Sequence, residues 1–132
     1  GPSIFYQEDW GIFGLDQDDE ACAVMFSVMS GNKNSPEEIR SGEYLKKVKS
    51  IAASEWIYDN PIPTVVAFGK YDKVQPFAAS IKLETALKEN HVDYKYYVLP
   101  HSGHGLQNDN KISRQWMESI EEYLEKYMPV KG

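Results

Sequence analysis

Cysteine and basic residues are both scarce in this sequence. Cys22 is the single cysteine among 132 residues, so no disulfide can form within the chain. The lack of disulfides is typical of a reducing compartment and no signal peptide is visible, so we expect a cytoplasmic location unless a leader belonged to a preceding segment. Lys and Arg number 14 against 20 Asp and Glu, which argues against the clustered basic charge of a nucleic-acid-binding surface.

Long apolar runs are also absent. No stretch reaches the ~20 residues that a membrane-spanning helix needs, so we expect no membrane span. A chain of 132 residues suffices for one domain. Its 42% hydrophobic and 26% charged residues are close to the composition of an ordinary globular protein.

The N-terminal part of the chain predicts helices. Residues 1–17 are aromatic and irregular, and we interpret them as a loop with at most one helical turn. Asp18 or Asp19 then suits a helix N-cap. Residues 21–29 are apolar nearly all round, which is typical of a buried helix, and Gly31 ends it.

A second helix start is marked by the sequence SPEE at residues 35–38. Ser35 and Glu38 have the spacing of a capping box, and Pro36 stands at the first helical position, where proline is favoured. We expect Gly42 to break this helix and a further helix to span residues 43–51.

From residue 64 onward the pattern predicts strand, helix, strand and helix. Residues 64–68 are wholly apolar and β-branched, which is typical of a parallel strand buried on both faces. We expect a helix over 77–90, a second strand over 93–99 and a helix over 110–128. A crossover of this length predicts a right-handed parallel pair. The expected inward positions of the two helices are Phe77, Ile81, Leu83 and Leu87, then Ile112, Trp116, Ile120, Tyr123, Leu124 and Tyr127.

Two candidate catalytic side chains follow the two strands. Asp72 comes just after the first strand and His104 just after the second. Because parallel strands end at the same edge of a sheet, we expect the carboxylate and the imidazole to lie side by side there. Such an Asp orients His and stabilises the imidazolium that forms when His accepts a proton. Gly103 and Gly105 are expected to let the backbone turn tightly around His104.

Plainer interpretations remain open for the same residues. Asp72 by itself is also a typical turn residue, because its side chain bonds to nearby backbone. His101 and His104 form His-x-x-His, but no third ligand is near, so we expect neither a metal nor any other cofactor. His101 is then a loop residue, and Cys22 is expected to be a small hydrophobic residue of the core.

The sequences GKYDKVQP at 69–76 and PHSGHG at 100–105, each after a strand, resemble the C-terminal part of an α/β-hydrolase of the esterase/lipase and dienelactone-hydrolase-like group. The resemblance covers residues 63 to about 127. It implies that Asp72 is the acid of a catalytic triad, that His104 is its histidine, and that Val74 and Pro76 belong to the turn that seats the acid loop. No Gly-x-Ser-x-Gly occurs in these residues, so the nucleophile and the oxyanion hole, which precede the acid in this group, are missing.

The resemblance therefore implies an α/β fold class: a partial α/β-hydrolase fold with its last two parallel strands and flanking helices. Residues 1–60 would be a helical cap or connecting region, and residues 61–132 would carry the acid and the histidine. The implied function is that of a C-terminal fragment of a serine carboxylic-ester hydrolase, inactive alone, whose parent takes a small ester substrate. The alternatives are a peptidase of the same fold and a non-catalytic α/β interaction module.

An exposed sheet edge and exposed helix faces are further consequences of such a fragment. Strand 64–68 would have a bare edge, with no Lys or Pro inside it to block pairing. We therefore expect a homo-oligomer, most simply a two-fold dimer that buries helix 21–29 and the open side of the sheet.

Overall fold

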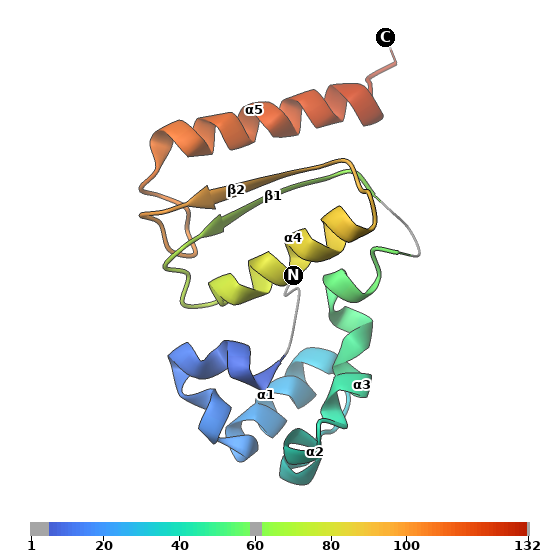
Figure 1. Cartoon of the computed structure of the whole chain (residues 1–132), viewed down its shortest axis with the longest axis vertical. Helices are drawn as coiled ribbons and strands as arrows, with labels where there is room; N and C mark the ends of the chain where they lie inside the picture. Colours follow the sequence, from blue (N-terminus) through green and yellow to red (C-terminus); the bar gives the residue numbers. More distant parts are fainter. Residues whose placement is uncertain (1–5, 59–61, 132) are drawn as a thin grey trace.

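The computed structural model describes residues 6–58 and 62–131, and its C-terminal part is built on a two-stranded parallel sheet that lies between α4 and α5 (Figure 1). β1 (Thr64–Gly69) pairs with β2 (Tyr94–Leu99) from Thr64 opposite Tyr94 to Gly69 opposite Leu99. α4 (Phe77–Glu89) connects the strands and lies on one face of the sheet, and α5 (Asn110–Tyr127) lies on the other. The predicted strand–helix–strand–helix order and the parallel pairing are confirmed.

Consecutive tyrosines of β2 tie the sheet to both helices. Side chains of a strand alternate between its two faces, so Tyr96 and Tyr97 point in opposite directions. The hydroxyl of Tyr96 lies 2.7 Å from Oγ of Ser80 on α4, and the hydroxyl of Tyr97 bonds to Oγ of Ser119 on α5. Both serines are buried. These pairs satisfy polar groups inside the two interfaces, so the tyrosines of β2 pack the sheet against both helices.

The N-terminal part is helical and lies beyond α4 (Figure 1). Its elements are η1 (Gln7–Phe13), η2 (Leu15–Gln17), α1 (Asp19–Ser30), α2 (Pro36–Ser41), α3 (Tyr44–Val48), η3 (Lys49–Ile51) and η4 (Ala53–Glu55). The expectation of a loop over residues 1–17 was wrong for residues 7–17, which form two 3-10 helices; residues 1–5 lie outside the described residues. Gly14 joins the two 3-10 helices with φ of 70°, a conformation that glycine adopts without strain. Its N–H bonds back to the carbonyl groups of Gly11 and Trp10 at the end of η1.

Local capping chemistry sets the helix ends as predicted. The side chain of Asp18 accepts a hydrogen bond of 2.9 Å from the backbone of Ala21 at the start of α1, and Gly31 ends that helix with φ of 70°. Ser35 and Glu38 form the complete capping box at the start of α2, with bonds of 3.2 and 2.8 Å. These contacts satisfy backbone groups that a helix leaves unpaired at its ends.

A first hydrophobic cluster lies wholly within the helical part. Its buried members are Trp10, Cys22, Ala23, Phe26, Ile39, Tyr44, Val48 and Ala52. Cys22 is a core residue, as predicted, and burial together with Asp19 raises the pKa of its thiol to about 11. The expectation that α1 is buried all round was wrong: Val24 and Val28 are 66% and 79% exposed, because only one face of the helix meets the cluster.

A second cluster joins α4 to the sheet. Leu83, Leu87 and Val92 are buried, and Val66 and Phe68 of β1 pack against them. Ile81 is exposed instead of inward. It lies two positions from the buried Leu83, and residues two apart on a helix do not share a face. On α5, Leu124 and Tyr127 are likewise exposed.

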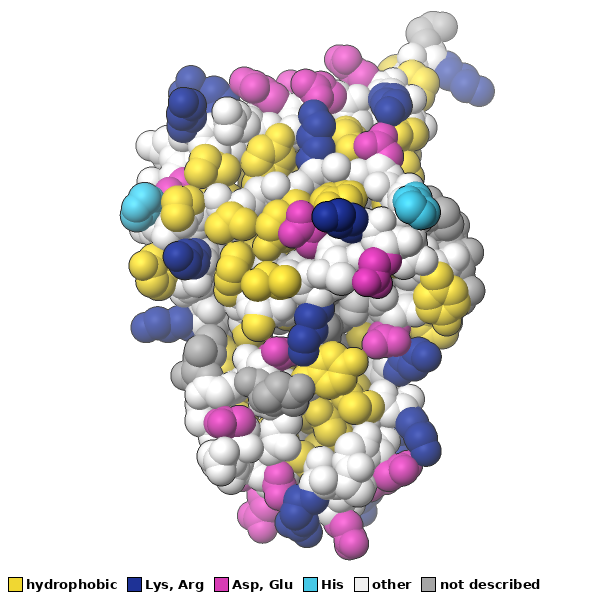
Figure 2. All heavy atoms as spheres, in the orientation of Figure 1, with side chains coloured by type: hydrophobic (Ala, Val, Ile, Leu, Met, Phe, Trp, Pro, Cys, Tyr) yellow, Lys and Arg dark blue, Asp and Glu magenta, His cyan; other side chains and the backbone are white. Residues whose placement is uncertain are grey.

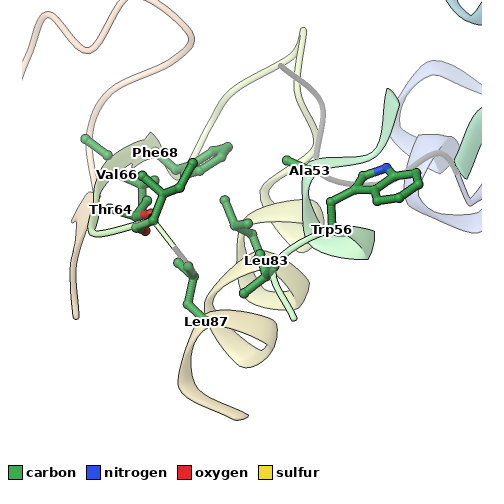
Figure 3. Close-up of a pocket in the computed structure, with 10 residues that line it drawn as sticks. Ala53, Trp56, Thr64, Val66, Phe68, Leu83 and Leu87 are labelled. Carbon is green, nitrogen blue, oxygen red and sulfur yellow. The ribbon is translucent and has the colours of Figure 1, made fainter. Parts of the chain in front are cut away.

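The expectation that β1 is buried on both faces was also wrong. Its residues Thr64 to Phe68 are only half-buried, because among the described residues β1 pairs with β2 alone. An apolar groove of about 580 Å³ lies beside it, and Figure 3 shows Val66 and Phe68 of β1 across from Leu83 and Leu87 of α4. Figure 2 shows hydrophobic side chains gathered over the strands and α4 on one face of the molecule. Within the described ranges, no helix has the length and apolar character needed to cross a membrane.

We predict that this open side of the sheet makes the chain self-associate as a two-fold dimer. Unpaired strand edges invite another strand, and large apolar patches rarely stay in water. Sedimentation velocity at micromolar concentration should show a dimer, and Ile62→Lys in the groove should shift it toward monomer. Val130→Lys, which also replaces an exposed apolar side chain but outside the groove, is the matched control. A wild-type monomer that unfolds cooperatively would contradict the prediction.

Candidate active site

The loop after β1 presents Asp72 as a buried acceptor. The side chain is 5% exposed, and its Oδ1 accepts backbone hydrogen bonds of 2.7 Å from Val74 and 2.8 Å from Gln75. Its Oδ2 lies 2.9 Å from Nδ1 of His104. Asp72 therefore acts as a turn residue through one oxygen and as a histidine partner through the other. The two interpretations of Asp72 are compatible.

The loop after β2 presents His104 with its ring open to solvent. Its side chain is 56% exposed, in contrast to the buried carboxylate that it contacts. An ionised carboxylate can only accept, so Nδ1 carries the proton and donates it to Asp72. Nε2 is then the ring nitrogen that is left to take a proton from a reacting group. This is the geometry of a general base with an orienting acid.

The two loops are held together by backbone contacts around Gly69. The N–H of Lys70 donates to Leu99 at 3.0 Å, and the N–H of Tyr71 donates to Ser102 at 3.0 Å. A Cβ atom on Gly69 would lie 2.2 Å from the carbonyl oxygen of Gly103. Only glycine fits there, so Gly69 permits the close approach that brings Asp72 to His104. Gly69 opens the motif of residues 69–76, but no role was predicted for it from the sequence.

Gly103 and Gly105 were expected to let the backbone turn tightly around His104, but neither adopts a conformation that only glycine favours. The glycines with positive φ among the described residues are Gly14, Gly31 and Gly42, so neither Gly103 nor Gly105 adopts the left-handed conformation. Gly103 instead contributes its backbone to the contact with Gly69. The tight turn around His104 comes from loop contacts, and glycine is not required there by φ.

A second histidine–carboxylate pair lies in the same loop. Nδ1 of His101 is 2.9 Å from Oδ1 of Asp109, and Oδ2 of Asp109 accepts bonds from the backbone of His101 at 3.0 Å and from Oγ of Ser102 at 2.6 Å. His101 and His104 thus bind different carboxylates, so the His-x-x-His spacing does not bring them together on one partner. Asp109 was not predicted from the sequence as a partner of a histidine. Its place directly before a helix, where Asp is common as an N-cap, was the available signal.

The carboxyl group of Asp109 is held in its ionised form. Burial raises its pKa, but the hydrogen bonds from Ser102 and His101 outweigh this effect and hold the pKa below its ordinary value. The group therefore carries a negative charge at neutral pH. Ser102, whose hydroxyl donates to it, is fully buried.

A pocket of about 680 Å³ adjoins the acid loop. It lies between η1 and the loop, and its lining includes Phe13, Tyr71, Asp72 and Phe77. Lys82 of α4 steadies the N-terminal wall, because its Nζ lies 2.7 Å from Oδ2 of Asp9, itself a lining residue, and 4.0 Å from the ring centroid of Tyr6. This wall was expected to be a loop, so the pocket was not predicted.

Comparison with known proteins agrees with this architecture. Residues 13–131 match the model of the prolyl oligopeptidase family, whose members are serine hydrolases of the α/β-hydrolase fold. The chain belongs to the prolyl oligopeptidase family. No curated protein and no solved structure matched it. The predicted fold class is confirmed, as is the resemblance to the C-terminal region of an α/β-hydrolase; the match does not single out the esterase and dienelactone-hydrolase-like group.

Proposed function

We propose that this chain supplies the acid and the base of a serine hydrolase, Asp72 and His104. The observation that carries the proposal is the 2.9 Å hydrogen bond between the buried carboxylate of Asp72 and the exposed ring of His104. Both side chains follow parallel strands at the edge where open α/β sheets place their sites. The family match supports the same reaction class.

The reaction follows from these two groups and a serine supplied from outside these residues. Nε2 of His104 takes the proton of the serine hydroxyl as the oxygen attacks a carbonyl carbon, and then passes that proton to the leaving alcohol or amine. A water molecule then attacks the acyl-enzyme in the same way: Nε2 takes its proton and passes it to the serine oxygen, and the carboxylic acid product and the free serine are released. Asp72 keeps the imidazole oriented and stabilises its charged form. Donors for the oxyanion come with the serine segment.

The first substrate class is a carboxylic ester, and a peptide bond is the second. The family match supports a serine hydrolase, and the peptide alternative fits it at least as well as the ester. Acid and base are common to both reactions, so the described pair supports either. The aromatic walls of the pocket beside Asp72 suit an apolar group of the substrate.

We predict that the 132-residue chain by itself hydrolyses neither a p-nitrophenyl ester nor a peptide p-nitroanilide above background. It contains no Gly-x-Ser-x-Gly to bear an activated serine. For the same reason, a fluorophosphonate probe that labels activated serines should leave it unlabelled. Turnover that disappears in His104→Ala would show that a nucleophile lies within these residues and would contradict this part of the proposal.

The proposed roles are tested in a protein that joins this chain to a segment bearing the nucleophile. There, His104→Ala should lower kcat by about 10⁶-fold, as loss of a triad histidine does, and Asp72→Asn by about 10⁴-fold. His91→Asn is the matched control, because His91 is exposed, distant from the pair in the chain, and has a positive φ of 53° that asparagine tolerates. Equal activity of His104→Ala and wild type would overturn the proposal.

A further inference from the structure

The backbone of the loop that carries His104 has to be held by contacts other than those of the His104 ring. The ring is more than half exposed and is held through Nδ1 to Asp72. Glycines flank it on both sides, and glycine loses more conformational freedom on ordering than any other residue. A catalytic hydrogen bond that depends on such a segment is weakened whenever the segment moves.

The carboxylate of Asp109 closes this loop. It is 5% exposed and accepts from the backbone of His101, from the ring of His101 and from the hydroxyl of Ser102. The hydroxyl of Ser102 in turn accepts from the backbone of Asn108 at 3.1 Å, and the Asn108 amide donates to the carbonyl of His101 at 2.7 Å. The start of the loop is thus tied to its end around one buried charge, and hydrogen bonds to a charge are stronger than neutral ones.

This cluster reaches both halves of the site through Ser102. The carbonyl oxygen of Ser102 accepts from Tyr71, the residue before Asp72, and lies against Gly69. His104 follows two residues after Ser102 on the other side. Holding Ser102 therefore holds the two loops in register with each other, although the hydrogen bonds of the Asp109 carboxylate go to His101 and Ser102.

Helix capping does not account for Asp109. It occupies the position before α5, but its side chain makes no bond to the first turn of that helix. Its oxygens are turned into the loop instead. We infer that Asp109 is a positioning residue, whose buried carboxylate fixes the loop of residues 100–109 so that His104 meets Asp72. Its relevance to catalysis rests on the proposed function.

Asparagine at this position tests the inference with little change of shape. Asp109→Asn replaces one acceptor oxygen by a donor that faces the donors of His101 and Ser102. In NMR spectra of the 132-residue chain, the Nδ1 proton of His104 should exchange with water about tenfold faster in this variant, the factor expected when a charge-assisted hydrogen bond is lost. Circular dichroism establishes that the variant is folded.

Asp93→Asn is the matched control. Asp93 is also a carboxylate that accepts side-chain bonds, of 2.7 Å from Tyr123 and 2.9 Å from Lys126 of α5, but it precedes β2 at the opposite end of the sheet. This variant should leave the His104 proton unchanged even where it lowers the melting temperature. A folded Asp109→Asn chain with unchanged exchange at His104 would overturn the inference.

Ser102→Ala keeps the experiment decisive where Asp109→Asn fails to fold. It removes one of three donors to the carboxylate and should speed exchange of the same proton by a smaller factor, roughly threefold. Unchanged exchange in a folded Ser102→Ala chain would then overturn the inference. Neither exchange measurement requires a nucleophile. A failure of this inference, seen as unchanged exchange of the His104 proton, is therefore distinct from a failure of the proposed function, seen in the hydrolysis assays.

Discussion

Replacing Gly69 by alanine is expected to lower the free energy of unfolding by about 1–3 kcal/mol, the usual cost of forcing an extra group into a packed site. The new methyl group would lie 2.2 Å from the carbonyl oxygen of Gly103 and 2.5 Å from that of Ser102. Both neighbours are backbone atoms, so relief requires the two loops to separate. We therefore expect the hydrogen bond between Asp72 and His104 to weaken in the same variant.

Denaturant unfolding measures the first effect, and the exchange rate of the Nδ1 proton of His104 measures the second. Gly103→Ala is the matched control in the facing loop, because its Cβ would meet Tyr71 at 3.6 Å, an ordinary contact, and its φ is not positive. It should cost clearly less than Gly69→Ala. Equal stability of the Gly69→Ala chain and wild type would mean that the loops are farther apart than described.

Replacing Phe26 by alanine is expected to cost about 3–5 kcal/mol, as for other fully buried aromatic side chains. Phe26 is fully buried in the helical cluster, and its ring stacks on Tyr44 with centroids 4.9 Å apart. Alanine would leave a cavity between α1 and α3. Val28→Ala on the same helix is the matched control, because Val28 is exposed and should change stability by no more than ~0.5 kcal/mol.

Urea unfolding of both variants measures the difference, and amide hydrogen exchange locates it. Because the helical cluster and the cluster beneath the sheet have no buried residue in common, exchange should accelerate more in α1 and α2 than in β2. Uniform acceleration over the whole chain would show that the two clusters unfold as one unit. A cost for Phe26→Ala as small as that for Val28→Ala would contradict the burial described for this ring.

The sequence alone determined the features that depend on neighbouring residues. Asp18 and the capping box at Ser35 mark helix starts because their side chains bond backbone groups three residues away. The parallel strands follow from two short runs, one apolar and one rich in Tyr, with a helix between them. That order was also enough to predict that Asp72 and His104 lie together, since both follow strands that end at one edge of the sheet.

Tertiary structure alone decided the features that depend on distant groups. The need for glycine at Gly69 comes from the carbonyl of Gly103, and the role of Asp109 comes from which way its carboxylate turns. Exposure of Val24 on α1 and of Ile81 on α4 depends on which face of each helix meets a partner. Periodicity shows that a side chain is apolar, but only packing between elements decides whether it is covered. The physical reason is that capping and strand order act along the chain, whereas burial and close approach act across it.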